Sequence, residues 1–114
     1  MSKNSETFDK LRMELRRGAI VLAVLGKLRR EHYGYSLGQA LAEDGIQIEE
    51  GTLYPLARRL EKQGLLQSEW REEDKRRKRF YRLSESGIEV FESLREEWRK
   101  LDQGLRAALE ENER

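Results

Sequence analysis

The stretch EGTLYPLARRLEKQGLL, residues 50–66, contains the pattern on which the predicted fold depends. Its apolar residues recur at i, i+3, i+4 and i+7, the spacing of a helix that buries one face. These residues are Leu53, Leu56, Ala57 and Leu60. Gly64 followed by Leu65 is typical of a Schellman motif, in which a glycine ends the helix. If Thr52 is the N-cap, Pro55 lies in the first turn, where no helical donor is required; if the helix starts earlier, Pro55 removes one hydrogen bond.

Two helices are predicted before this stretch. The first covers residues 11–28, and its continuous apolar run at residues 19–25 indicates a helix that is central in the fold. The second covers residues 36–44 and carries apolar residues at i, i+3 and i+4. It is expected to end at Asp44-Gly45, where glycine suits the position after the last turn.

The segment between these helices, Tyr33-Gly34-Tyr35-Ser36, is predicted to form a turn. Gly34 can adopt positive φ there. His32, just before it, is interpreted as a solvated loop residue. At the start of the chain, the polar residues 1–10 are interpreted as a flexible or partly helical N-terminal arm.

A two-stranded hairpin is predicted over residues 66–83, because apolar and polar residues alternate from Leu66 to Trp70. Trp70 is interpreted as a structural residue that covers the apolar base of this hairpin. The charged sequence EEDKRR, residues 72–77, is predicted to be the turn. It contains neither Gly nor Pro, so Asp74 or its neighbours must adopt less favourable backbone conformations.

A long final helix is predicted to begin with Ser84 as the N-cap and an acidic residue in the first turn. From residue 91 its apolar residues are separated by alternating steps of 3 and 4, which is a heptad seam. Such a narrow stripe on a charged helix requires another helix against it. Together with the first helix, it supplies the predicted dimer interface: Leu11, Phe91, Leu94, Trp98, Leu101 and Leu105.

The order helix, helix, helix, strand, strand, long helix is that of a winged helix-turn-helix. The predicted fold class is therefore mainly α with a small β-hairpin, extended by a long C-terminal dimerisation helix. The predicted domains are an arm at 1–10, a DNA-binding domain at 11–83 and the dimerisation helix at 84–114. Only 37% of the 114 residues are apolar, so a homodimer is expected to supply further apolar surface.

Charge is unevenly distributed, although the chain has 23 Lys and Arg against 22 Asp and Glu. Residues 1–52 have no net charge, residues 53–83 carry +5, and residues 84–114 carry −4. The third helix and the hairpin therefore hold the positive charge, and these elements meet DNA in this architecture. Double-stranded operator DNA is the predicted partner. The predicted DNA contacts are Tyr35, Thr52, Tyr54, Arg58, Lys75, Arg76, Arg77 and Lys78.

Several of these residues have an alternative structural interpretation. Thr52 is also a suitable N-cap, and Tyr54 is equally suited to packing against the second helix. Tyr35 is alternatively a half-buried core residue, and the cationic run at residues 75–79 is alternatively a solvated hairpin tip. The alternative function is a winged-helix module that binds another protein through its heptad helix and does not bind DNA.

The composition excludes several other classes of protein. The absence of Cys excludes a disulfide framework, and the single residue His32 cannot form a zinc site alone. No nucleophile–base pair, metal set or phosphate loop is found, so an enzyme is the least expected class and no cofactor is expected. No apolar run reaches the roughly 18 residues of a membrane span, and the N-terminus lacks the apolar segment of a secretory signal. A cytoplasmic location and no membrane partner are therefore expected.

Several blocks of this sequence resemble the PadR family of transcriptional regulators. They occur in the family's order between residues 11 and 87, and the block that opens the third helix is the most specific. The blocks are Leu15-Arg16-Arg17-Gly18, Tyr33-Gly34-Tyr35, Glu50-Gly51-Thr52-Leu53-Tyr54-Pro55-Leu56, the segment 59–65, Ser68-Glu69-Trp70 and the segment 79–84. The single C-terminal helix resembles that of the short subfamily, which dimerises through this helix and the first one. The family's hairpin usually carries Gly or Pro at its tip, and this hairpin has neither.

The resemblance implies a dimeric repressor that releases DNA when a small planar aromatic ligand binds. In multidrug-responsive members a flat apolar pocket lies at the dimer centre, flanked by a Trp from each final helix; Trp98 matches that position and Asp102 matches an acidic pocket residue. Arg95 departs from those members and favours anionic ligands or an occluded pocket. Alternatively, Trp98 is part of the dimer core. The facing residues on the first helix are Leu15, Gly18, Ala19 and Leu22.

Overall fold

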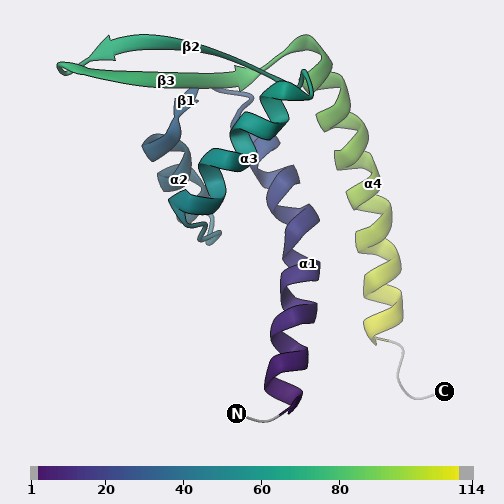
Figure 1. The fold of residues 1–114 in the computed structure, drawn as a ribbon. Helices are drawn as coiled ribbons and strands as arrows, with labels where there is room; N and C mark the ends of the chain where they lie inside the picture. The colour runs from purple at the N-terminus through teal and green to yellow at the C-terminus, as the bar shows by residue number, and fades with distance from the viewer. Residues whose placement is uncertain (1–2, 111–114) are drawn as a thin grey trace.

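The fold is a winged helix with a small antiparallel sheet above three packed helices and a fourth, long helix at the side (Figure 1). The computed structural model describes residues 3–110. The elements in chain order are α1 (Lys3–Lys27), β1 (His32–Tyr33), α2 (Gly34–Glu43), α3 (Glu50–Lys62), β2 (Leu66–Glu73), β3 (Arg76–Leu83) and α4 (Glu85–Glu110). The predicted mainly α fold with a β-hairpin is confirmed, and β1 adds a third strand in the order β1-β3-β2.

Helix α1 starts earlier than predicted. It runs from Lys3 to Lys27, so residues 3–10 are helical and the predicted boundary at residue 10 falls inside the helix. Only its second half is packed into the core, through Val24 and Leu25. The first half projects below the rest of the molecule in Figure 1 and is almost wholly exposed.

Helices α2 and α3 end with the same Schellman geometry. Gly45 and Gly64 follow the last turns with φ of 85° and 84°, a conformation that glycine adopts without steric cost. In α2 the N–H of Ile46 bonds to the carbonyl of Leu41 at 2.9 Å, and in α3 the N–H of Leu65 bonds to that of Leu60 at 3.0 Å. Both glycine stops predicted from the sequence are therefore confirmed.

The start of α3 decides between the two alternatives that the sequence left open. Glu49 is the N-cap, so Thr52 lies inside the helix and does not cap it. Pro55 is then the sixth helical residue, where its missing N–H leaves the carbonyl of Gly51 without its helical donor. The earlier of the two possible starts is the one observed.

The turn predicted at residues 33–36 is not observed, because Tyr33 ends strand β1 and residues 34–36 are the first three residues of α2. Gly34 is needed there for close packing rather than for positive φ, since a Cβ at this position would lie 2.2 Å from Cε1 of Tyr54. His32 is also not a solvated loop residue. It is half-buried, its Nδ1 lies 3.0 Å from the hydroxyl of Ser36, and burial lowers its pKa.

The hairpin turn is shorter than predicted. Strands β2 and β3 pair up to Glu73 and Arg76, which leaves a two-residue loop in place of six residues. The loop residues Asp74 and Lys75 have φ of 53° and 65°. Two residues with positive φ are characteristic of a type I′ hairpin turn, a geometry that Asn-Gly adopts more easily. The unfavourable turn expected around Asp74 is thus confirmed.

The junction between α3 and α4 is close-packed. Ser84 caps α4 as predicted, because its hydroxyl accepts the N–H of Gly87 at 3.0 Å. The N–H of Ser84 also donates to the carbonyl of Leu65 at 2.9 Å. This carbonyl lies so close to Gly87 that a Cβ there would be 2.0 Å from its oxygen. The end of α3 and the start of α4 therefore form one continuous contact.

Phe91 belongs to the core of the protomer, which corrects its prediction as a dimer contact. Its side chain is only 5% exposed and packs against Gly26 of α1, with the guanidinium of Arg29 5.0 Å from the ring centre. The heptad spacing therefore begins inside the protomer, and the first turns of α4 are part of the winged-helix core.

The rest of α4 leaves that core. From residue 92 onward its residues are exposed apart from half-buried Asp102. Helices α1 and α4 thus project as two separate helices, and the molecule extends over 60 Å in its longest dimension (Figure 1). Within residues 3–110, no helix combines the length and the apolar character that crossing a membrane requires.

Candidate nucleic-acid interface

Helix α3 presents a basic face to solvent. Its buried face consists of the four apolar residues predicted from the sequence. The opposite face is exposed and comprises Gly51, Thr52, Pro55, Arg58, Arg59 and Lys62. Three cations and Pro55 therefore face outward from the helix that enters the groove in this architecture.

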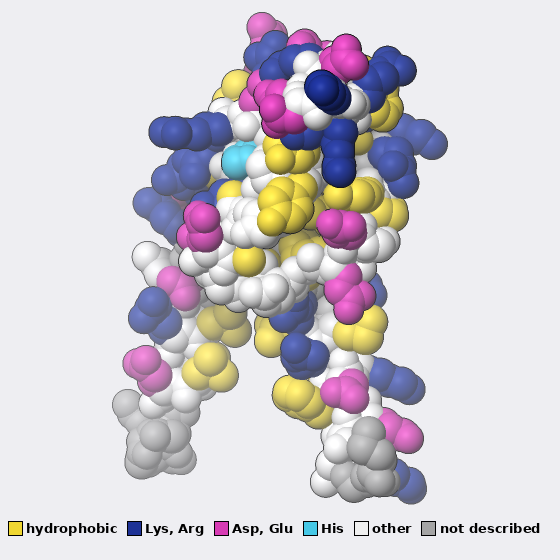
Figure 2. All heavy atoms as spheres, turned by 90° about the vertical axis from the view of Figure 1, so that its left-hand side faces the viewer, with side chains coloured by type: hydrophobic (Ala, Val, Ile, Leu, Met, Phe, Trp, Pro, Cys, Tyr) yellow, Lys and Arg dark blue, Asp and Glu magenta, His cyan; other side chains and the backbone are white. Residues whose placement is uncertain are grey.

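The hairpin adds a second group of cations, although not all those predicted. Lys75, Arg76 and Arg77 are exposed around the hairpin tip, which points toward the viewer in Figure 2. Lys78 differs from them. Its side chain is only 17% exposed, its ammonium lies 4.3 Å from the ring centre of Tyr33, and it bonds to a Glu73 carboxylate oxygen at 3.3 Å. Lys78 is thus held by the protein and is a weaker candidate for DNA contact.

Arg79, the last cation of the same run, is also engaged within the protein. Its guanidinium bonds to the carboxylate of Glu61 on α3 at 3.1 Å. The five consecutive cations therefore divide into three exposed residues and two that fasten the hairpin to its surroundings.

The two predicted tyrosine contacts differ in exposure. Tyr35 is 57% exposed at the start of α2, where its hydroxyl accepts a hydrogen bond from Gln39 at 2.8 Å. It is therefore a surface residue rather than a half-buried one. Tyr54 is half-buried against Gly34, and burial together with the nearby Glu50 carboxylate raises its pKa. The packing role of Tyr54 is observed, and its hydroxyl stays protonated at neutral pH.

Trp70 does not cover the base of the hairpin. It is 51% exposed on β2, and the guanidinium groups of Arg77 and Arg79 lie 5.0 and 5.4 Å from its ring. Cation–π contacts of this kind are attractive even at partly exposed sites. The indole therefore fixes the side chains of two hairpin cations on one face of the sheet.

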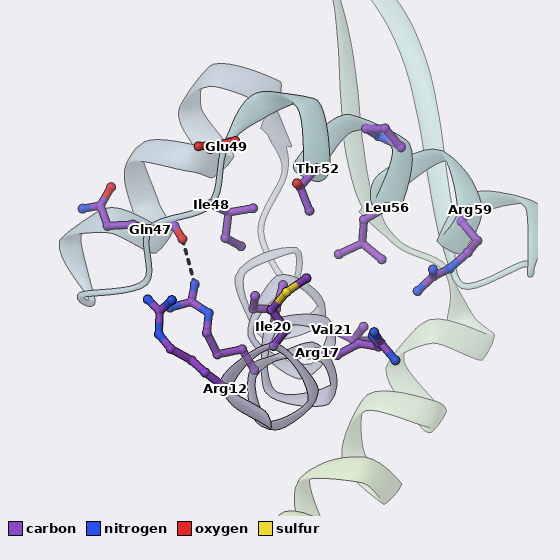
Figure 3. Close-up of a pocket in the computed structure, with 13 residues that line it drawn as sticks. Arg12, Arg17, Ile20, Val21, Gln47, Ile48, Glu49, Thr52, Leu56 and Arg59 are labelled. Carbon is purple, nitrogen blue, oxygen red and sulfur yellow. Dashed lines mark hydrogen bonds between the residues drawn. The ribbon is translucent and has the colours of Figure 1, made fainter. Parts of the chain in front are cut away.

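A groove of about 740 Å³ lies between α1, the α2–α3 loop and the start of α3 (Figure 3). Its floor is apolar, with Ile20, Ile48 and Leu56 pointing into it. Its rim is cationic and was not predicted, because its members come from distant segments. The rim cations are Arg12, Arg16, Arg17 and Arg59.

The residues predicted to bind a ligand do not line this groove. Leu15, Gly18 and Ala19 are exposed on α1, Leu22 is half-buried, and Trp98 is 43% exposed on α4. Asp102 bonds to Arg106 at 3.2 Å on its own helix. Arg95 lies toward Glu92 and the Phe91 ring, at 3.7 and 5.7 Å. In the protomer these residues therefore lie apart from the groove.

The projecting helices carry a series of exposed large apolar side chains. Figure 2 shows hydrophobic groups along both helices below the main body. On α1 they are Phe8, Leu11, Met13 and Leu15, and on α4 they are Leu94, Trp98, Leu101, Leu105 and Leu109. Exposed apolar surface of this extent is characteristic of an interaction site.

Comparison with known proteins gives consistent matches. A family model described as the transcriptional regulator PadR-like family matches residues 21–93. The transcriptional regulator Rv3488 of Mycobacterium tuberculosis is 38% identical over 97 residues, which cover 84% of this chain and 88% of that protein.

Solved structures show the same similarity. A PadR family transcriptional regulator from Eggerthella lenta superimposes with a TM-score of 0.84 at 42% identity, covering 96% of this chain and 97% of that one. A PadR-like transcription factor from Bacteroides fragilis superimposes with a TM-score of 0.74 at 27% identity, covering 87% and 98%.

Proposed function

The chain belongs to the PadR-like family of transcriptional regulators, and on this premise we propose that it is a dimeric repressor that binds an operator in double-stranded DNA. The observation that supports this proposal is the segregation of charge. Exposed cations lie on α3 and at the hairpin tip, whereas the residues after 83 carry a net charge of −4. DNA phosphates attract the cations of α3 and the hairpin tip and repel the acidic residues after residue 83. The charge distribution therefore orients the protein on the duplex.

In the proposed complex α3 lies in the major groove and the hairpin contacts the flanking backbone or minor groove. Arg58 and Lys62 on α3 and the exposed cations of the hairpin supply the charge-assisted bonds to phosphates or base edges. Thr52 lies at the start of α3, and Tyr35 at the start of α2, where short polar contacts to phosphate are common.

The proposed homodimer buries the exposed apolar side chains of α1 and α4 against a second copy. Helices with one apolar stripe associate in this way, and a two-fold dimer would present two α3 helices about one helical turn of DNA apart. Leu11, Leu94, Trp98, Leu101 and Leu105 are the interface residues that this proposal retains, since Phe91 is already buried.

A small planar aromatic compound is the proposed inducer. Its proposed site lies between the two protomers and includes Trp98, Asp102 and the small residues Gly18 and Ala19, with Leu15 and Leu22 beside them. The exposed indole of Trp98 supports this, since aromatic rings stack on one another with favourable geometry.

The hairpin contacts can be tested by salt dependence. Replacing Lys75, Arg76 and Arg77 together with alanine is expected to flatten the plot of log Kd against log salt by about 2.7 units per bound protomer, since each phosphate contact contributes about 0.9. The measurement is fluorescence anisotropy of a labelled duplex of about 30 base pairs, selected by the wild-type protein from a random pool. Lys78→Ala is the control, and its slope should change by less than about half a unit because Glu73 and Tyr33 hold that ammonium. An unchanged slope in the triple variant excludes phosphate contacts by the hairpin tip.

The ligand site can be tested by tryptophan fluorescence. The chain has two Trp residues, so Trp70→Phe leaves Trp98 as the sole indole. Saturable quenching by some members of a panel of cationic, neutral and anionic planar aromatic compounds is expected, because stacking on the indole alters its emission. The reverse variant, Trp98→Phe, should show no saturable quenching. If no compound quenches Trp98, its role is limited to packing the dimer.

A further inference from the structure

Glu61 places a carboxylate among the cations of α3. It lies on α3 directly after Arg58, Arg59 and Leu60 and directly before Lys62. Its side chain is only 26% exposed. A negative charge at this place opposes the approach of phosphate, so its presence calls for a physical explanation.

The Glu61 carboxylate joins α3 to both strands of the hairpin. One oxygen accepts a hydrogen bond from the hydroxyl of Ser68 on β2 at 2.6 Å. The guanidinium of Arg79 on β3 donates to both carboxylate oxygens, at 3.1 and 3.3 Å. Arg79 Nε also donates to the Ser68 hydroxyl at 3.0 Å, which closes the network among these three side chains.

Neighbouring rings restrict Arg79 further. Its guanidinium lies 5.4 Å from the centre of Trp70 and 5.8 Å from that of Tyr81. Trp70 pairs with Arg79 across the strands, and Tyr81 pairs with Ser68. The network therefore lies on one face of the hairpin, where the sheet leaves the core and continues toward the tip.

The hairpin tip lies far from this network, so a small change of the hairpin angle at the network moves the tip by a large distance. Asp74 in the hairpin loop is six residues beyond Ser68, which corresponds to about 20 Å along a strand. A rotation of the hairpin by about 10° at the network would displace the tip by about 3.5 Å, a distance comparable to a complete hydrogen bond. Exposed cations at the tip can thus contact phosphate in register with α3 only if the hairpin angle is held.

We propose that Glu61 is a positioning residue that locks the hairpin at a set angle to α3 through Ser68 and Arg79. This inference rests on the proposed DNA binding, in which α3 and the hairpin contact one duplex together. The network stabilises the arrangement before DNA arrives, so that binding does not include the entropic cost of ordering the hairpin.

The proposal predicts an effect opposite in sign to simple electrostatics. Removing a carboxylate from a basic surface should strengthen binding to a polyanion if charge alone matters. If Glu61 acts through hairpin position, the Glu61→Gln variant should bind the selected duplex at least about tenfold more weakly and with a salt slope flatter by about 2 units per protomer, because contacts at the tip are lost. The matched control is Glu72→Gln, which removes the same charge from the exposed part of β2 without touching α3. The control should bind as tightly as the wild type or more tightly.

A measurement without DNA tests the lock separately. Backbone amide ¹⁵N relaxation of residues 72–77 in the Glu61→Gln variant should show increased motion, while the amides of α3 stay unchanged. Ser68→Ala removes only the bridging hydroxyl and should give a smaller change in the same direction, with circular dichroism confirming that both variants are folded. If the wild type binds no duplex from the pool, the proposed function fails, and the relaxation data alone then decide whether the lock exists. Equal or tighter binding by Glu61→Gln, or unchanged hairpin motion, overturns the proposal.

Discussion

Replacing Gly87 with alanine is expected to lower the melting temperature by about 10 °C or more, because it destabilises the fold by about 3 kcal/mol. An added Cβ would lie 2.0 Å from the carbonyl oxygen of Leu65. That oxygen is backbone and accepts the N–H of Ser84, so it cannot move without opening the junction between α3 and α4. Thermal unfolding followed by circular dichroism at a fixed protein concentration is the appropriate measurement.

Gly104→Ala is the matched control for this substitution. Gly104 lies in the same helix, and no atom beyond its chain neighbours and the backbone of that helix lies within 4 Å of the added Cβ. Alanine is the better helix former there by about 0.5–1 kcal/mol, so a small rise in melting temperature is expected. Equal melting temperatures for Gly87→Ala and the wild type would show that the start of α4 does not pack on Leu65 as described.

Replacing Leu101 with glutamate is expected to convert the proposed dimer into monomers or unfolded chain at micromolar concentration. Leu101 is 58% exposed in the protomer and lies on the proposed seam of α4. The two-fold symmetry of the proposed dimer places each substitution in the interface twice. Burying two unpaired carboxylates costs several kcal/mol, which raises the dimer Kd by roughly a thousandfold or more. Sedimentation equilibrium gives the mass directly.

Arg99→Glu distinguishes a specific seam from a general effect of charge. Arg99 is also exposed on α4, where it pairs with Glu96 of its own helix. It lies outside the apolar stripe, so the variant should remain dimeric. A dimer of unchanged stability in Leu101→Glu would place the interface elsewhere on the molecule.

Local sequence patterns predicted most of the fold. The helical periodicity in residues 50–66 and the two glycine stops depend on neighbouring residues alone, and each is observed. Strand β1 was missed because two residues cannot display an alternation, and it exists only through its pairing with β3. Residues 3–10 gave too weak a pattern to distinguish an arm from a helix.

Prediction of the site was limited by contacts between distant residues. The heptad spacing correctly predicted that the Phe91 side chain is buried. It could not show that Gly26 leaves space for the Phe91 ring within the same protomer. The cationic run likewise did not reveal that Tyr33 and Glu61 hold two of its members. Such assignments depend on which segments meet in space, and charge counts along the chain do not contain that information.

The projecting first half of α1 also affects the susceptibility of the chain to proteolysis. Its trypsin sites include Lys10 and Arg12. The projecting first half of α1 has no tertiary packing, and an unpacked helical segment is only marginally stable. Its peptide bonds are therefore readily accessible to a protease. In the proposed dimer a second copy shields them, and dilution exposes them again. Association into the proposed dimer would therefore also slow proteolytic cleavage of α1.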